Sequence, residues 1–266
     1  MAGILSSDGP TSTANVLRVT PARTFPQLLA QRLQHDPGQP LITAYDETTG
    51  ERTELSVTTY ANWVSKTANL LTEELGLDAG DTVLIDLPPH WLVPVFLGAA
   101  WSAGLSVTDD RGAAHDVAVC GPDSIGEHDD AEHVLACSLL PFAVRFSDPV
   151  PGRVFDFGLL WPGQSDVFVA VTPPSPDTVA WVSSERPRTH ADLLEEAAFT
   201  EHEGEVRLLT DMHPAAQAGV PAFLAPMVHG GSVVLLRHPA EATWPARRKD
   251  ERATVELRAC DQPPSL

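Results

Sequence analysis

Cysteine is scarce in this sequence, and no two cysteines form a recognisable pair. The 266 residues include only three, Cys120, Cys137 and Cys260, with no Cys-x-x-Cys spacing among them. A disulfide framework and a cysteine-based zinc site are therefore not expected. Cys120 and Cys137 lie within apolar runs, where a thiol usually acts as a small hydrophobic group.

Positive charge and long apolar runs are also in short supply. The chain has 17 Lys and Arg residues against 36 Asp and Glu residues, which gives a formal net charge of −19. Such a chain repels phosphate backbones and anionic lipid, which argues against nucleic-acid binding and membrane docking. No apolar run approaches the ~18 residues needed to span a bilayer, and residues 1–20 do not resemble a secretory signal. We therefore expect a cytoplasmic protein.

Several motifs of catalytic proteins are missing. The sequence contains neither a Gly-x-Ser-x-Gly elbow nor a Gly-x-Gly-x-x-Gly loop. The first absence argues against a hydrolase of the usual serine type, and the second against a dinucleotide site of the usual kind. Because any Ser, His and Asp triple would be a chance match without known geometry, no catalytic residue is assigned.

Two charged stretches are interpreted as solvated loops. Residues 126–133 carry two histidines and several carboxylates, but His128 and His133 stand at i and i+5. Metal-binding helices place histidines at i and i+4, so an acidic loop is favoured over a zinc site, and no metal ligand is assigned. Residues 109–111 are likewise interpreted as a charged turn.

The apolar pattern predicts an α/β protein. A helix is expected over residues 24–35, a β-hairpin over 41–55 with Gly50 in its turn, and a long helix from Ser56 to Gly76. Further strands are expected at 83–87, 105–108, 117–120, 134–138, 178–182, 206–209 and 232–236, and further helices at 90–103, 188–199 and 215–228. This alternation favours a three-layer α/β/α arrangement around a largely parallel sheet.

The same pattern divides the chain into three parts. Residues 1–20 are rich in Ser, Thr and Gly, and we expect a flexible N-terminus there. Residues 21–239 form the α/β domain, interrupted at 141–176 by an irregular stretch with seven prolines. Residues 240–266 are polar without periodicity and are interpreted as a C-terminal tail.

Two segments carry a family resemblance. The first contains Thr59-Tyr60 at the start of a long helix, Gly80-Asp81 before a strand and Ala103-Gly104 at the end of a second helix. The second runs from Leu209 to His213 and continues into Gly230-Gly231 and a Val-rich strand. In this order and spacing they resemble the adenylate-forming superfamily, which includes acyl-CoA synthetases, peptide-synthetase adenylation domains and luciferases.

The resemblance covers roughly residues 24–239 and extends to short actinobacterial proteins of this type. It implies the fold of the first part of the N-terminal domain of acyl-CoA synthetases. It also implies that His213 lies near an acyl carboxylate, although a helix-capping or surface histidine is the alternative.

The phosphate-binding loop of that superfamily is not preserved. The family loop is rich in Thr, Ser and Gly and ends in Pro-Lys-Gly, but Ser183-Ser184-Glu185-Arg186-Pro187-Arg188 stands at its place after Trp181. No glycine gives a phosphate room near the backbone, Glu185 would repel it, and Arg188 would be a poor substitute for the lysine. The family motifs for adenine, magnesium and ribose and the lid with its lysine are also missing, so ATP, AMP and Mg²⁺ are not expected as cofactors.

Three functions follow from this pattern. The favoured one is a non-catalytic accessory or interaction module that acts through a homo-oligomer or a protein partner. The second is a remnant binder of acyl or nucleotide ligands that uses His213, Ser183, Ser184 and Arg188. The third is an enzyme of different chemistry in the inherited cleft.

Overall fold

The computed structural model describes residues 21–128, 131–198 and 205–261. The flexible N-terminus that we predicted over residues 1–20 lies outside this part of the chain. Along the described residues, no helix combines the length and the apolar character needed to cross a membrane.

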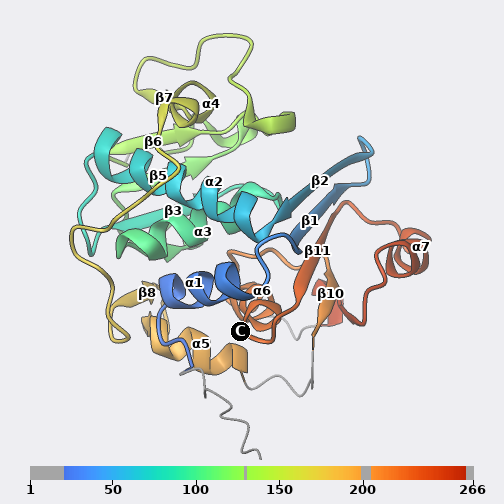
Figure 1. Ribbon diagram of the computed structural model, residues 1–266. Helices are drawn as coiled ribbons and strands as arrows, with labels where there is room; N and C mark the ends of the chain where they lie inside the picture. The colour runs from blue at the N-terminus through green and yellow to red at the C-terminus, as the bar shows by residue number, and fades with distance from the viewer. Residues whose placement is uncertain (1–20, 129–130, 199–204, 262–266) are drawn as a thin grey trace, which may run out of the picture.

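The described strands form two sheets, and only two of the pairings are antiparallel (Figure 1). The larger sheet has the order β7-β6-β5-β3-β4-β8-β9, with β3 Thr82–Asp86, β4 Ser106–Thr108, β5 Val117–Cys120, β6 His133–Ala136, β7 Val154–Asp156, β8 Val179–Trp181 and β9 Arg188–Thr189. The smaller has the order β12-β10-β11-β1-β2, with β1 Pro40–Asp46, β2 Glu51–Ser56, β10 Arg207–Thr210, β11 Ser232–Arg237 and β12 Val255–Leu257.

The α/β class and the largely parallel pairing are confirmed, but one sheet was expected where two exist. The strands predicted at 206–209 and 232–236 belong with the β1–β2 hairpin, because β11 pairs in parallel with both β1 and β10. The order of the elements in the sequence does not predict that β11 pairs with the first hairpin and that β10 joins the same sheet through β11.

The N-terminal helices form where the sequence predicts them. Helix α1 (Phe25–His35) begins after Thr24, whose side chain accepts a hydrogen bond from Gln27 N. Helix α2 (Val57–Asn69) begins after Ser56, whose Oγ accepts from Thr59 N at 3.1 Å. A wider turn (Leu70–Glu74) extends α2, and Gly76 then takes the left-handed φ of 71° that ends it.

Helix α3 (Leu92–Ala103) is the centre of the main core. Nearly all of its residues are buried, and its Pro94 lies in the first turn, where a missing N–H costs nothing. The Pro94 carbonyl accepts from Tyr60 Oη at 2.8 Å, while Trp101 Nε1 donates to Ala180 O at 2.8 Å. These bonds join α3 to α2 and to the larger sheet.

The remaining helices cover the other strands. Helix α5 (His190–Ala198) packs beside α6 (Gly219–Val228), and both were predicted. The irregular stretch at 141–176 also contains β7 and a short helix, α4 (Phe157–Leu160), which the sequence analysis missed. Three strand residues are too few for a periodic pattern to show, and the Asp156 carboxylate, which accepts from Gly158 N and Phe146 N, stabilises the turn instead.

The prediction of a polar tail from residue 240 was wrong for the residues described. Helix α7 (Thr243–Asp250) lies at the right of Figure 1, and β12 pairs in parallel with β10. Trp244 is 2% exposed and packs in a small core with Tyr45, Leu209, Val234 and Leu236. One buried tryptophan produces no helical periodicity, so the hydrophobic pattern could not predict helix α7.

Candidate functional site

The predicted site residues gather where parallel strands end. Asp109 follows β4, Ser183 follows β8 and His213 follows β10. The carboxyl ends of parallel strands are the usual ligand-binding edge of α/β proteins, because loops and helix starts meet there. Two side-chain contacts join the edges of the two sheets: His213 with Leu87, and Gln217 with Glu185.

His213 uses both ring nitrogens on backbone groups. Nε2 lies 2.7 Å from Leu87 O, and Ala215 N donates to Nδ1 at 3.1 Å, which fixes the proton on Nε2. Burial lowers the pKa of His213, although the Leu87 bond and the charges of Asp109 and Asp86 oppose that shift. His213 is therefore a neutral bridge between β3 and the segment after β10, and its role in ligand binding stays a prediction.

The loop that replaces the family's phosphate loop makes bonds within the protein. Ser183 Oγ donates to Arg186 O at 3.1 Å, and Ser184 is exposed. Glu185 accepts from Gln217 Nε2 at 3.1 Å, which places a carboxylate across the loop from the His213 segment. The loop thus presents the Glu185 carboxylate to the space beside it.

Arg188 turns towards α5. Its Nη1 lies 2.9 Å from Glu196 Oε2, and its guanidinium carbon lies 5.4 Å from the centre of the Trp181 ring. The side chain is largely buried, and Nη2 has no hydrogen-bond partner. Its charge is therefore mostly neutralised by Glu196, with one donor left over.

Asp109 is the residue at this edge that the sequence analysis missed. Partial burial of its carboxyl group is the main cause that raises its pKa, while the charges of His213 and Arg188 lower it. Asp109 is therefore near enough to His213 and Arg188 for their charges to act on it. A signal existed, because Asp109 directly follows a short buried strand, but it was interpreted as part of a charged turn.

A second cluster surrounds Asp86 at the end of β3. Arg111 contacts both carboxylate oxygens, at 3.1 and 2.7 Å, and His128 Nε2 lies 2.9 Å from Oδ2. Burial opposes ionisation of Asp86, but the bonds from Arg111, Ser124 and His128 outweigh it and lower its pKa.

The interpretation of residues 126–133 as a solvated loop is wrong for His128, which is 2% exposed. Its partner Asp86 is 42 residues away, so no local pattern predicted the contact. Among the described residues, no three His, Cys, Asp or Glu side chains come together as a metal site would require.

Comparisons with known proteins agree with this geometry. No family model matches the chain. A TIGR03089 family protein from Mycobacterium tuberculosis is 34% identical over 251 residues, which cover 90% of this chain and 99% of that protein.

Solved structures of adenylate-forming enzymes share the fold. Coronafacic acid ligase from Pectobacterium brasiliense matches with a TM-score of 0.72 at 9% identity, over 88% of this chain and 50% of that one. A fatty acyl CoA synthetase from Mycobacterium tuberculosis matches with a TM-score of 0.67 at 16% identity, over 88% and 49%. The chain spans about half the length of these structures, and the predicted resemblance to acyl-CoA synthetases is confirmed at the level of fold.

Proposed function

The chain belongs to the TIGR03089 protein family, and we propose that it is a non-catalytic interaction module with the fold of an adenylate-forming enzyme. The observation that carries this proposal is the loop from Ser183 to Arg188. A loop that activates ATP must offer free N–H groups, room beside its backbone and a cation. This loop has no glycine to give a phosphate room, its Arg188 charge is paired with Glu196, and its exposed Glu185 adds a negative charge.

Three polar side chains of the loop already have other contacts. Ser183 is bonded to Arg186 O, the Glu185 carboxylate is held by Gln217, and the Arg188 charge is paired with Glu196. A triphosphate would therefore meet a fixed carboxylate on a chain of net charge −19. Electrostatic repulsion and the missing clearance both argue against acyl-adenylate formation.

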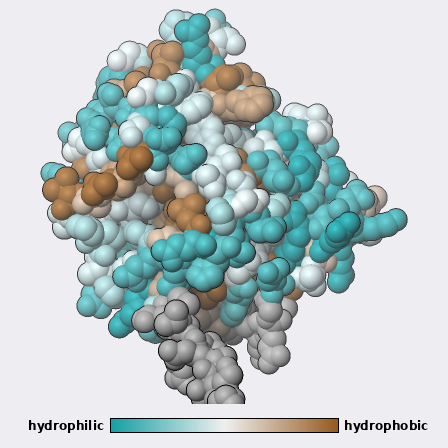
Figure 2. Space-filling model, viewed as in Figure 1, coloured by the Kyte–Doolittle hydropathy of each residue, from teal (hydrophilic) through white to brown (hydrophobic). Residues whose placement is uncertain are grey.

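An exposed apolar row supports contact with another protein. Val167, Val169 and Val171 are 67%, 81% and 102% exposed. They alternate along an extended segment whose Phe168 packs against the main core. Figure 2 shows brown residues along the left edge, where the segment between α4 and β8 runs in Figure 1. Apolar groups gathered in this way on a surface are typical of interaction sites.

A thermal-shift panel with AMP, ATP-Mg, a fatty acid and its acyl-CoA tests the proposal. We expect ATP-Mg to leave the melting temperature unchanged, because the loop lacks glycine and places the Glu185 carboxylate where the phosphates would lie. Saturable stabilisation by submillimolar ATP-Mg, together with ATP–pyrophosphate exchange in the presence of a fatty acid, would overturn the proposal.

Binding of an acyl or nucleotide ligand is the second candidate function, and one observation favours it. Arg188 Nη2 is a buried donor without a partner, and the Arg188 charge acts on Asp109 at the same sheet edge. In the same panel, stabilisation by AMP or the fatty acid that is kept in His35→Gln and lost in His213→Gln would select this function.

A further inference from the structure

A cleft of about 570 Å³ lies between the two sheets, away from the loop at 183–188 and from His213. Its walls come from the β1–β2 hairpin, the end of β11, residues 89–91 before α3 and residues 139–141 after β6. The volume is in the range that holds small organic ligands in proteins. No residue of the candidate site described above lines this cleft.

His90 brings an unused hydrogen-bond donor to the cleft. The side chain is 9% exposed, and Leu92 N donates to its Nδ1 at 3.2 Å, so the ring proton is on Nε2. Among the described residues, none accepts from that Nε2. Burial is the main cause that lowers the pKa of His90 to about 4, and the charge of Arg237 adds to it. At neutral pH His90 is therefore an uncharged donor.

Three ionic groups of the cleft are close enough to pair with one another. Asp46 contacts Arg237 at 3.3 Å and His238 at 3.4 Å, and it accepts from Thr48 N at 2.9 Å. Burial alone would raise the pKa of Asp46, but the bonds from Thr48 and His238 and the Arg237 charge lower it to about 2. The charge of Arg237 is balanced by Asp46, although its buried Nε has no hydrogen-bond partner, so among its described residues the cleft holds no unpaired cation for an anionic ligand.

Strained backbone borders the same cleft. Leu139 and His238, two residues that line it, have φ angles of 57° and 54°. This left-handed region is costly for residues other than glycine and is concentrated at ligand sites, where the surrounding fold maintains it. Both strained residues thus belong to the lining that a ligand would contact.

We propose that this cleft binds an uncharged amphipathic small molecule, with its apolar body against Trp91, Leu139 and Leu235 and with a carbonyl or hydroxyl oxygen that accepts the His90 Nε2 proton. The remaining walls fit this class. Pro89, Leu140 and Pro141 add apolar surface, and Glu51 adds negative charge that disfavours a carboxylate ligand.

Three probes that share a benzyl group test the proposal: phenylacetamide, phenylacetate and toluene. Binding is followed by the indole N–H resonance of Trp91 in ¹⁵N-labelled protein, assigned with Trp91→Phe. We expect a saturable shift with phenylacetamide, weaker binding of phenylacetate and the weakest binding of toluene. Absence of a saturable shift with phenylacetamide, or tighter binding of phenylacetate, would overturn the proposal.

Variants of His90 test the hydrogen bond itself. We expect His90→Leu to weaken phenylacetamide binding about tenfold, the worth of one buried hydrogen bond, while His90→Gln keeps a donor and most of the affinity. His35→Leu on the exposed end of α1 is the matched control and should bind as the unaltered protein does. Equal affinity in His90→Leu and His35→Leu would refute the role of His90. His90→Gln also keeps the test open should His90→Leu not fold.

Discussion

His90 and His190 are buried and uncharged in the folded protein. His190 Nδ1 accepts from Phe25 N at 3.2 Å, and its Nε2 has no partner. Burial lowers the pKa of His190 to about 4, and that of His90 to about 4 as well. Within the described part of the chain neither ring is hydrogen-bonded to a carboxylate, and the charge of Asp46, which favours protonated His90, does not outweigh burial. Protonation must therefore compete with the packing of α1, α3 and α5.

Acidification is therefore expected to destabilise the fold between pH 6.5 and 4. An unfolded histidine has a pKa of about 6.5, so in this window the unfolded chain binds more protons than the folded one. These histidines do not lower the free energy of unfolding above pH 6.5. As the pH falls towards 4, each histidine lowers it by up to about 3 kcal/mol. Urea unfolding at several pH values measures this loss.

His190→Asn provides the control for this pH dependence. Asparagine keeps an acceptor for Phe25 N but does not titrate, so the slope of stability against pH should fall by about half. A free energy of unfolding that stays constant from pH 6.5 to 4.5 would contradict the prediction. Asp46, with a pKa of about 2, loses its contribution only below pH 3.8 and does not interfere.

At the same scale, the sequence named most residues of the candidate site but not their contacts. His213 and Ser183 follow the carboxyl ends of parallel strands, whereas Asp109, which does so too, was not selected. The roles depend on partners distant in the chain, such as Leu87 for His213. A hydrogen bond between residues 126 positions apart does not appear in the periodicity of the sequence. Sequence alone therefore cannot show that the His213 ring is already hydrogen-bonded to Leu87 O.

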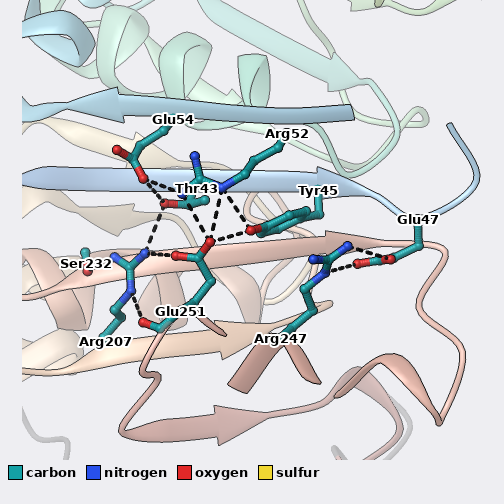
Figure 3. A network of polar contacts seen from close by, with 9 residues as sticks. All are labelled: Thr43, Tyr45, Glu47, Arg52, Glu54, Arg207, Ser232, Arg247 and Glu251. Carbon is teal, nitrogen blue, oxygen red and sulfur yellow. Dashed lines mark hydrogen bonds and ion pairs between the residues drawn. The ribbon is translucent and has the colours of Figure 1, made fainter. Parts of the chain in front are cut away.

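Among the elements, α7 and the turn after it depend on one buried carboxylate. Glu251 accepts hydrogen bonds from Tyr45, Arg52 and Arg207, and its side chain is 8% exposed (Figure 3). Arg247 adds a second attachment, because its guanidinium carbon lies 4.0 Å from the centre of the Tyr45 ring and the group pairs with Glu47. This network joins the C-terminal segment to β1, β2 and β10.

Glu251→Ala is expected to destabilise the protein by about 3 kcal/mol, because it leaves Arg207 and Arg52 without their shared acid. The free energy of unfolding in urea measures the loss, and hydrogen exchange of the β12 amides should rise first. The control is Glu241→Ala, whose side chain is 85% exposed and pairs with Arg258 at 2.8 Å; it should cost under about 1 kcal/mol. Equal losses in the two variants would show that the network does not hold this segment.

Elements with many buried positions were predicted well, and short or polar ones were not. Helices α2 and α3 bury whole faces, so their apolar spacing is visible in the sequence. Helix α7 buries only Trp244, and β12 has three residues that are all half-buried. Their stability comes from ion pairs and from the neighbouring β10, neither of which changes the local hydrophobic pattern.

For the whole molecule, two opposing forces decide whether copies associate. The net charge of −19 makes copies repel one another, while the row of Val167, Val169 and Val171 favours burial. Two hydrogen bonds hold the backbone of this segment in place, because Asn69 Nδ2 donates to Ser165 O at 2.9 Å and to Val167 O at 3.0 Å. The extended segment is thus presented in a fixed form, which lowers the entropic cost of a contact.

Self-association through this row is therefore expected to strengthen with salt, since ions screen the repulsion but leave apolar contacts intact. Sedimentation at low and high sodium chloride measures it. Val169→Asp should abolish the salt-dependent association, because it places a new charge in the middle of the row. Leu159→Asp is the matched control, since Leu159 is 57% exposed but lies on α4, outside the row. A monomer at both salt concentrations would rule out a second copy as the partner, and equal loss in the two variants would place the contact elsewhere on the surface.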